Sequence, residues 1–382
     1  MMVGLLQETL SGEKRVALVP AQIALLQKQK HSVLAQRGAG AAAGYADAEY
    51  EAAGAKLLSR DEIFAQAELL VAVRGGTLAQ ERGKLRPGQV LVALLEPLSA
   101  PRTSEQLAKS GATLFALDLV PRISRAQSMD ALSSMANLAG YKAVLLAASH
   151  APRVLPMMTT AAGTLAPAKV LVLGVGVAGL QAIATAKRLG AAVEAYDIRP
   201  EVAEQVKSVG GKFVDLGLAV QDASDKGGYA KAQTAEFIAR QQEALAQFVR
   251  AADVVITTAQ VPGRRAPILV TAAMQKGMKA GSIIVDLAGE SGGNCELTQP
   301  GETIVVEGVT MFAPANLVSE VAFHASQLYS RNVVNFILNL TSKEGAMKVA
   351  AEGAQEDEIL RESRVAAGGA VTHPRVQRAL TA

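Results

Sequence analysis

Short apolar runs alternate with helix-like segments along most of the chain. In the first third, apolar runs of strand length occupy residues 1–7, 31–36, 67–74, 88–95 and 112–120. Between them, residues 20–30 and 46–55 have the pattern of helices that cover one face of a sheet. Alternating strands and helices are typical of a parallel sheet with covering helices. We therefore expect an α/β unit here.

The middle of the chain repeats this alternation, and the turns between its elements are more clearly marked in the sequence. Strand candidates occupy residues 168–174, 191–197, 211–216, 252–259, 281–288 and 309–314. Strands in this number, most of them preceded by helices or turns, are typical of a doubly wound dinucleotide-binding fold. The fold class that we expect is α/β, with two Rossmann-like doubly wound domains whose sheets are mostly parallel.

Two long helices with apolar periodicity, at residues 129–149 and 317–340, bracket this second unit. If both cross between the domains, the tail after Leu340 packs back on the first domain, which is then discontinuous. The predicted domains, joined by the long crossing helices, are residues 1–130 plus 320–382 and residues 131–319.

Composition and charge narrow the classes of protein. A chain of 382 residues is longer than one hydrophobic core usually supports, so we expect two domains. The net charge is only +3 and tryptophan is absent, so nucleic acid is not an implied partner. Cys295 is the single cysteine and the histidines are scattered, so we expect no disulfide within the chain and no metal site. A cytoplasmic protein fits this composition best.

Residues 170–186 are uncharged over about the minimum length of a transmembrane helix. Three glycines split this segment into a short apolar strand and an alanine-rich helix, so we expect no membrane span here. Residues 1–20 carry an acidic residue where a signal peptide would continue its apolar core. We therefore expect neither a secretory signal nor direct insertion into a membrane.

Gly174, Gly176 and Gly179 form a G-x-G-x-x-G motif after a predicted strand and at the start of a predicted helix. In a dinucleotide-binding turn the first glycine permits the tight turn, the second lets the backbone approach a pyrophosphate, and the third lets the helix pack on the strand. Asp197 ends the next strand, where a carboxylate accepts hydrogen bonds from a ribose 2′-hydroxyl. The pattern favours NAD(H), although Arg199 nearby leaves NADP(H) open. The alternative is that the glycines serve packing alone and Asp197 caps a helix.

Further polar candidates follow predicted strands, at the edge where open parallel sheets bind ligands. They are Thr258, Ala259 and Gln260 after one strand, and Asp286 and Glu290 after the next. Glu290 fits an acid or base, and fits a helix or turn cap equally well. Gly228 and Tyr229 lie in a charged segment that fits either a lid over a bound nucleotide or an exposed loop tip.

A polar stretch, PRISRAQSMD at residues 121–130, separates an apolar strand from a long helix, although a connecting loop needs only turn formers. A dehydrogenase that acts on an alcohol, amine or keto acid normally needs a group that moves a proton, usually His, Lys or a tuned carboxylate. The strand ends of the first domain present Arg74 and Leu94, and neither exchanges a proton usefully.

Several motifs together resemble one family over nearly the whole chain. They are GEKRVALVPAQ, PRISRAQSMDALSSMANLAGYKAV, MMTTAAGT, VLVLGVGVAGLQAIATAKRLGA, GGYAK, ITTA and VDLAGESGGNCE. This set is similar to the NAD(H)-binding domain I of proton-translocating nicotinamide nucleotide transhydrogenase. The chain also resembles alanine dehydrogenase, a structural relative, through RVALVPAQ and the glycine motif. In that enzyme a catalytic lysine and histidine would fall at about Arg74 and Leu94 and an aspartate at about Glu290, so all three positions depart from it.

The resemblance implies a role for the polar stretch. Transhydrogenase passes a hydride directly from NADH on this domain to NADP⁺ on a separate domain, so no acid or base is required and the protein's task is positioning. By this resemblance Arg122 and Asp130, with Ser133, orient the nicotinamide end of NAD(H), and Gln127 reaches toward the partner's nucleotide. Without the family, Asp130 fits a helix N-cap and Arg122 a surface ion pair. The implied nucleotide contacts are Arg122, Gln127, Ser128, Met129, Asp130, Ser133, Gly174, Gly176, Val177, Ala178, Gly179, Asp197, Ile198, Arg199, Gly228, Tyr229, Gln241, Thr258, Ala259 and Gln260.

The resemblance also implies partner subunits. In the family the complete enzyme has a membrane part that conducts protons and an NADP(H)-binding part, and this chain ends before either. We expect a separately encoded subunit that is catalytic only with those partners, forms a homodimer and docks on them at the inner face of the cytoplasmic membrane. The alternatives are an amino acid dehydrogenase of the alanine type and a non-catalytic NAD-sensing module.

Overall fold

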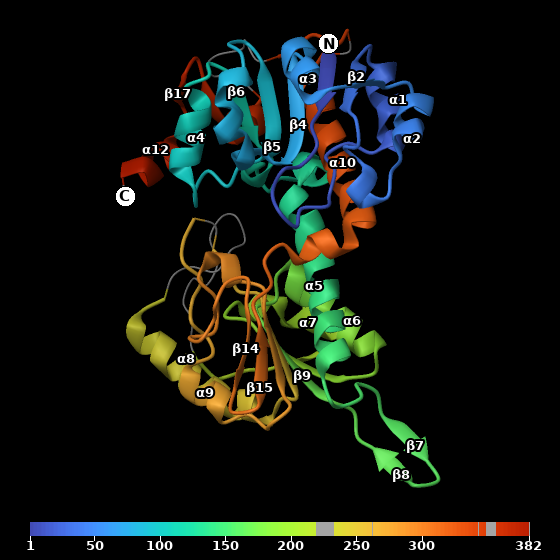
Figure 1. The fold of residues 1–382 in the computed structure, drawn as a ribbon. Coiled ribbons are helices and arrows are strands. Elements are labelled where there is room, and N and C mark those ends of the chain that lie inside the picture. Colours follow the sequence, from blue (N-terminus) through green and yellow to red (C-terminus); the bar gives the residue numbers. More distant parts are fainter. Residues whose placement is uncertain (219–232, 262, 343, 349–356, 382) are drawn as a thin grey trace. The chain divides into compact units, whose positions relative to one another are not determined.

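The computed structural model describes residues 1–218, 233–261, 263–342, 344–348 and 357–381. The chain divides into two compact units. Unit 1 comprises Met1–Met135 and Val318–Ala382, and unit 2 comprises Ala136–Leu317. Each unit is built around its own sheet, and Figure 1 shows both sheets with their helices.

The sheet of unit 1 has the strand order β17-β16-β6-β5-β4-β1-β2-β3. Its strands are β1 (Met2–Leu5), β2 (Ser32–Gln36), β3 (Lys56–Leu58), β4 (Leu69–Arg74), β5 (Val90–Leu94), β6 (Thr113–Ala116), β16 (Arg364–Ala367) and β17 (Ala370–Val371). Strands β1 to β6 pair in parallel, and β16 adds to β6 in the antiparallel sense. Strands β5 and β6 are buried throughout, as continuous apolar runs in a parallel sheet should be.

Helices cover this sheet and complete its core. They are α1 (Pro20–Lys28), α2 (Asp47–Ala52), α3 (Arg60–Gln66), α4 (Pro101–Ala108), α10 (Ala322–Leu340), α11 (Glu358–Ser363) and α12 (Pro374–Thr381). Proline occupies the first turn of α1, where its missing N–H costs no helical hydrogen bond. Ser59 and Glu62 form a capping box at the start of α3.

Short 3₁₀ helices replace part of two predicted segments, the end of a strand and the start of a helix. The strand predicted at 112–120 stops at Ala116, because the chain turns into η3 (Leu117–Leu119). The helix predicted at 317–340 begins as η7 (Leu317–Val321) and becomes α-helical only at Ala322. A further 3₁₀ helix, η4 (Ser124–Met129), lies in the polar stretch.

Unit 2 has a seven-stranded sheet with the order β11-β10-β9-β12-β13-β15-β14, of which only β14 runs antiparallel to its neighbour. Its strands are β9 (Lys169–Leu173), β10 (Ala192–Tyr196), β11 (Lys212–Phe213), β12 (Val254–Thr257), β13 (Ile283–Asp286), β14 (Thr303–Val306) and β15 (Val309–Phe312). Its helices are α5 (Ala131–His150), which begins within unit 1, α6 (Val177–Arg188), α7 (Ala203–Ser208), α8 (Ala235–Ala251) and α9 (Ala272–Lys276). The expected α/β fold with mostly parallel, doubly wound sheets is confirmed in both units.

A hairpin of β7 (Met158–Thr160) and β8 (Gly163–Leu165) forms a separate small sheet of unit 2 (Figure 1). All residues of both strands are exposed, including Met158 and Leu165. The uncharged segment 170–186 is split as expected into β9, a glycine turn and the start of α6. Of the helices in the described part of the chain, none combines the length and the apolar character that crossing a bilayer requires.

Candidate functional site

The glycine motif of unit 2 forms a turn between β9 and α6. Gly174 has a φ of +94°, a conformation that favours glycine. A Cβ atom on Gly179 would lie 2.0 Å from the carbonyl oxygen of Gly174, so only glycine lets α6 approach β9 this closely. A Cβ atom on Gly176 would meet no atom of the described residues within 4 Å, so among them this position faces open space at the N-terminus of α6. The turn therefore has the geometry that a bound pyrophosphate needs.

Helix α5 supports this turn through a contact that the sequence did not reveal. A Cβ atom on Gly140 would lie 2.0 Å from the carbonyl oxygen of Ala178, in the first turn of α6. Val177 and Ala178 are half-buried at the start of that helix. Gly140 therefore lets α5 pack against the backbone that would face the phosphates.

Asp197 follows β10 directly and is 8% exposed. Its Oδ2 accepts a hydrogen bond of 2.7 Å from the backbone N–H of Val175, inside the glycine turn. The guanidinium group of Arg199 donates to both carboxylate oxygens at 2.8 Å, and Ile198 between them is half-buried. The carboxylate thus lies beside the turn, but a ribose hydroxyl must share it with the guanidinium group or displace that group.

The loop after β12 contacts the same turn. Thr258 donates from its hydroxyl to the Gly174 carbonyl at 2.9 Å, and the amide of Gln260 binds the Leu287 carbonyl at 2.8 Å. Ala259 is held by Asn294, whose side chain accepts from its N–H at 2.9 Å and donates to its carbonyl at 2.8 Å. Asn294 is fully buried and was not among the predicted residues. No local sequence signal marks it, because its partner lies 35 positions away.

Two of the sequence candidates in unit 2 have buried structural partners. Gln241 lies in α8, is 5% exposed, and donates at 2.8 Å to the hydroxyl of Tyr196 at the end of β10. Asp286 is fully buried and accepts hydrogen bonds from Thr257 at 2.9 Å and from the backbone N–H of Asn294 at 2.7 Å. Both side chains therefore stabilise residues at the ends of strands of this sheet.

Three more residues of unit 2 were predicted as site residues from the sequence. Glu290 is an exposed residue of η6 (Gly289–Ser291). Gly228 and Tyr229 fall outside the residues that the structure describes.

The polar stretch at 121–130 lies in unit 1. Arg122, Gln127 and Ser128 are exposed, whereas Met129 is 7% exposed and anchors the loop. Asp130 accepts hydrogen bonds from the backbone N–H of Ser133 at 2.8 Å and from its hydroxyl at 2.6 Å. Asp130 is therefore an N-cap of α5, which also fixes the direction of its carboxylate.

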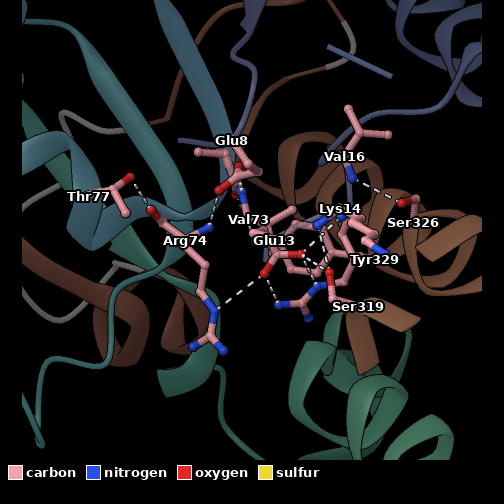
Figure 2. A network of polar contacts seen from close by, with 12 residues as sticks. Glu8, Glu13, Lys14, Val16, Val73, Arg74, Thr77, Ser319, Ser326 and Tyr329 are labelled. Atoms are coloured by element: carbon pink, nitrogen blue, oxygen red, sulfur yellow. Dashed lines mark hydrogen bonds and ion pairs between the residues drawn. The ribbon is translucent and has the colours of Figure 1, made fainter. Parts of the chain in front are cut away.

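The sheet of unit 1 has its own switch point, where the strand order reverses between β1 and β4. In open α/β sheets a ligand binds in the crevice beyond the strand ends at such a point. Here Glu8, which follows β1, accepts hydrogen bonds from the backbone N–H groups of Val73 at 2.6 Å and Arg74 at 3.0 Å (Figure 2). The protein's own carboxylate therefore binds the N–H groups that an anionic ligand would use.

Ion pairs extend this network in unit 1. The side chain of Glu13 is fully buried. It accepts two hydrogen bonds from the Arg15 guanidinium group, at 2.8 and 2.5 Å, and a third from the Ser319 hydroxyl at 3.1 Å. Arg74 lies 3.6 Å from Glu13 and forms an ion pair with Glu96. Figure 2 shows Arg74, Glu13 and Ser319 in one group. Both guanidinium groups thus have carboxylate partners within the chain.

Arg74 and Leu94 occupy the positions where alanine dehydrogenase would have its catalytic lysine and histidine. Leu94 is a buried apolar residue at the end of β5, and Glu96, two residues later, forms an ion pair with Arg74. Glu96 has a φ of +51°, which turns the chain away from the strand direction. Glu96 was not among the predicted residues, because nothing in the local pattern shows which residue beyond the strand faces Arg74.

Burial changes the acidity of two carboxyl groups near this network. It raises the pKa of Glu8, and the N–H groups of Val73 and Arg74 oppose that rise. Burial also raises the pKa of Asp118 to about 6, against a hydrogen bond of 2.9 Å from the backbone N–H of Leu95. Within the described ranges, no three His, Cys, Asp or Glu side chains gather as a metal site would require.

Comparisons with known proteins identify the family of the chain. Residues 4–139 match the family model "Alanine dehydrogenase/PNT, N-terminal domain", and residues 143–374 match "Alanine dehydrogenase/PNT, C-terminal domain". The chain is 45% identical to "NAD(P) transhydrogenase subunit alpha" of Cereibacter sphaeroides over 98% of this chain and 71% of that protein. It is 43% identical to a Rhodospirillum rubrum protein that is named as the first part of NAD(P) transhydrogenase subunit alpha, over 98% of each protein.

Solved structures and a more distant relative complete the comparison. A crystal structure of transhydrogenase from Sinorhizobium meliloti is similar with a TM-score of 0.84 and 40% identity, over 98% of this chain and 99% of that one. "Alanine dehydrogenase" of Mycobacterium tuberculosis is 31% identical, over 89% of this chain and 87% of that protein. The chain therefore belongs to the alanine dehydrogenase/PNT family, and its transhydrogenase relatives are closer to it than its alanine dehydrogenase relatives.

Proposed function

We propose that this chain is the NAD(H)-binding subunit of a proton-translocating transhydrogenase. In this proposal a hydride passes directly between NADH on this chain and NADP⁺ on a partner subunit, and a membrane subunit couples the transfer to proton movement. One observation carries the proposal: among the described residues, the nucleotide turn of unit 2 is open at Gly176, whereas at the switch point of unit 1 the chain's own carboxylates bind the N–H and guanidinium groups. A nucleotide turn in one unit, together with a second switch point whose polar groups are bound within the chain, suits transfer between two nucleotides.

The nucleotide would bind unit 2 through its pyrophosphate and its adenosine ribose. The first N–H groups of α6, which have no partner within a helix, would donate to the pyrophosphate beside Gly176. The Asp197 carboxylate would accept hydrogen bonds from the ribose hydroxyls, and Ile198 and Arg199 would flank the ribose. Because the Asp197 carboxylate repels a 2′-phosphate, NAD(H) is the proposed ligand. The loop of Thr258, Ala259 and Gln260 would line the same turn.

The loop of unit 1 would act on the nicotinamide end. We assign Arg122 and Asp130, with Ser133, to orienting the nicotinamide, and Gln127 to the contact with the partner's nucleotide. Bound NADH supplies the hydride, and the loop residues hold the ring in a reactive orientation. Positioning of this kind lowers the barrier because the entropy of aligning the two rings is lost before the reaction. Asp130 suits this task, since its two bonds to Ser133 fix its rotamer.

Partner subunits follow from the same proposal. The curated relatives are called alpha subunits, which implies further subunits in those proteins. We place this chain at the inner face of the cytoplasmic membrane, held there by NADP(H)-binding and membrane-spanning partners. The exposed hairpin of β7 and β8 supports a homodimer, because Met158 and Leu165 are 44% and 54% exposed and a second copy would cover them.

The test is NADPH-dependent reduction of an NAD analogue by the purified chain, alone and mixed with an NADP(H)-binding transhydrogenase subunit. We expect activity only in the mixture. A parallel assay offers pyruvate, ammonium and NADH, and should show no NADH oxidation. Oxidation there would support an amino acid dehydrogenase, and NADH binding without any transfer would support a sensing module.

A further inference from the structure

Few interactions within the loop that carries Gln127 stabilise its conformation. It is a six-residue 3₁₀ helix, η4, in which only Ala126 and Met129 are buried. Such helices have poor hydrogen-bond geometry and are rarely longer than three or four residues. The carbonyl of Ser128 lies near the C-terminal end, where helical carbonyls lack a partner within the helix. Side chains from elsewhere must therefore hold this end of the loop.

Helix α10 supplies two donors to that carbonyl. The Nδ2 atoms of Asn332 and Asn335 lie 2.9 and 3.2 Å from the carbonyl oxygen of Ser128. The two asparagines are three positions apart, so they share one face of the helix. A carbonyl oxygen has two lone pairs, and the two amides can use both. This arrangement fixes the oxygen from two directions.

The burial of Asn332 indicates that this contact has a role. Asn332 is 5% exposed, between apolar positions such as Val333. A buried amide costs stability unless it is hydrogen-bonded, and the bond from Asn332 goes to the loop. An aliphatic side chain would suit the core better if packing alone mattered.

Other polar side chains of α10 also hold backbone groups of unit 1. Ser326 accepts a hydrogen bond of 2.9 Å from the N–H of Val16, and Tyr329 donates to the carbonyl of Ala72 at 2.9 Å. Figure 2 shows Ser326 bound to Val16 in this way. The helix is therefore a polar support for several segments, of which the loop at Ser128 is one.

An ion pair also holds the loop, but it is a weaker restraint than the asparagine pair. Arg125 makes two hydrogen bonds to Asp357, at 2.7 and 2.9 Å. The Arg125 side chain is 49% exposed, and ion pairs in contact with solvent contribute little to stability. The asparagine pair is therefore the stronger restraint on η4.

We propose that Asn332 and Asn335 are positioning residues for hydride transfer. By holding the Ser128 carbonyl, they set the direction in which the preceding residue, Gln127, presents its side chain. Neither asparagine belongs to the assigned nucleotide contacts. This inference rests on the function proposed above for the loop.

The first experiment measures transfer in the mixture of the full chain with its partner subunit. Asn335→Ala removes one donor at a half-buried position, and Asn335→Asp keeps the shape but places an acceptor against the Ser128 carbonyl. We expect kcat to fall by about tenfold to a hundredfold in both variants, since misplacement on the scale of 1 Å has effects of that order. NADH affinity, measured by fluorescence titration, should stay unchanged. Asn339→Ala, one turn further along α10, is the control and should keep wild-type kcat.

The second experiment reports on the loop without any enzymatic activity. Hydrogen exchange of the full chain alone should become faster over residues 121–130 in Asn335→Ala and Asn335→Asp, and should not change in Asn339→Ala. An unchanged exchange rate in both Asn335 variants would overturn the inference, and so would a loss of NADH affinity in proportion to kcat. If the wild-type chain binds NADH but transfers no hydride, the proposed function fails, and the exchange rates still decide whether the asparagines hold the loop.

Discussion

Replacing Gly176 by alanine should separate nucleotide binding from folding. Gly176 has a φ of −83° and a ψ of −164°, in the extended region that alanine also adopts. Among the residues that the structure describes, the added Cβ atom would meet no atom within 4 Å. If the pyrophosphate occupies that space, as we propose, the methyl group collides with the ligand and with nothing else.

The magnitude follows from the two environments of this methyl group. In the free protein, alanine at an unstrained position should stabilise the fold by about 0.4–1 kcal/mol, because it restricts the unfolded chain. In the complex, one extra methyl group in a space that the ligand already fills weakens the binding free energy by about 1–3 kcal/mol. This corresponds to a Kd for NADH that is roughly 5- to 150-fold higher.

Gly179→Ala is the opposite case at the same turn. Its Cβ atom would lie 2.0 Å from the Gly174 carbonyl oxygen, so α6 must move away from β9. Overpacking of this kind costs about 1–3 kcal/mol or more, and should lower the melting temperature without NADH. Gly83→Ala in unit 1, where the added Cβ atom also meets nothing within 4 Å, is the matched control.

The assay is fluorescence titration with NADH, together with thermal unfolding in the absence of nucleotide. We expect Gly176→Ala to lose affinity at an unchanged or slightly higher melting temperature, and Gly179→Ala to melt earlier. Undiminished NADH affinity in Gly176→Ala would refute the reasoning, because it would mean that no phosphate approaches this backbone.

Three further predictions follow from other parts of the chain. Gln127→Asn shortens the exposed side chain of the loop and should slow hydride transfer in the mixture strongly while NADH affinity, by titration, stays the same. Asp118 has a folded-state pKa raised from 3.8 to about 6, so its contribution to stability falls as the pH rises from about 4 through about 6. In urea unfolding at pH 4.5 and 7.5, Asp118→Asn should lack this loss, which amounts to at most about 3 kcal/mol. Leu165→Asp on the exposed hairpin should give a monomer by sedimentation while leaving NADH affinity intact, and a variant that stays dimeric would exclude the hairpin as the contact.

The sequence predicts the central strands of both sheets because a parallel strand buried on both faces must be a continuous apolar run. Strand β12, buried at every position, is an example. Strand β14 was not predicted, since it lies at the sheet edge and alternates between exposed and half-buried residues. Strands β7 and β8 were not predicted either, because residues exposed on both faces leave no periodic signal.

Within the candidate site, the sequence predicts the residues whose role is local. The three motif glycines are recognisable because the requirements of a tight turn act within six positions of the chain. Asn294 and Asn332 act on backbone groups 35 and 204 positions away. Only the folded chain brings such partners together, and an asparagine at these positions looks like any polar residue.

The two sheets reverse their strand order at equivalent points but differ in the residue after the first strand. After β9 the turn carries glycines and is open at Gly176, whereas after β1 the chain carries Glu8, whose carboxylate binds the N–H groups of Val73 and Arg74. A reaction that moves a proton needs a titratable group facing the substrate. In unit 1 the carboxylate of Glu8 is bound to backbone groups and that of Glu13 to a guanidinium group, so both are committed to structure. The proposed hydride transfer between two nucleotides requires no such group, so it is compatible with committed carboxylates in unit 1 and an open glycine turn in unit 2.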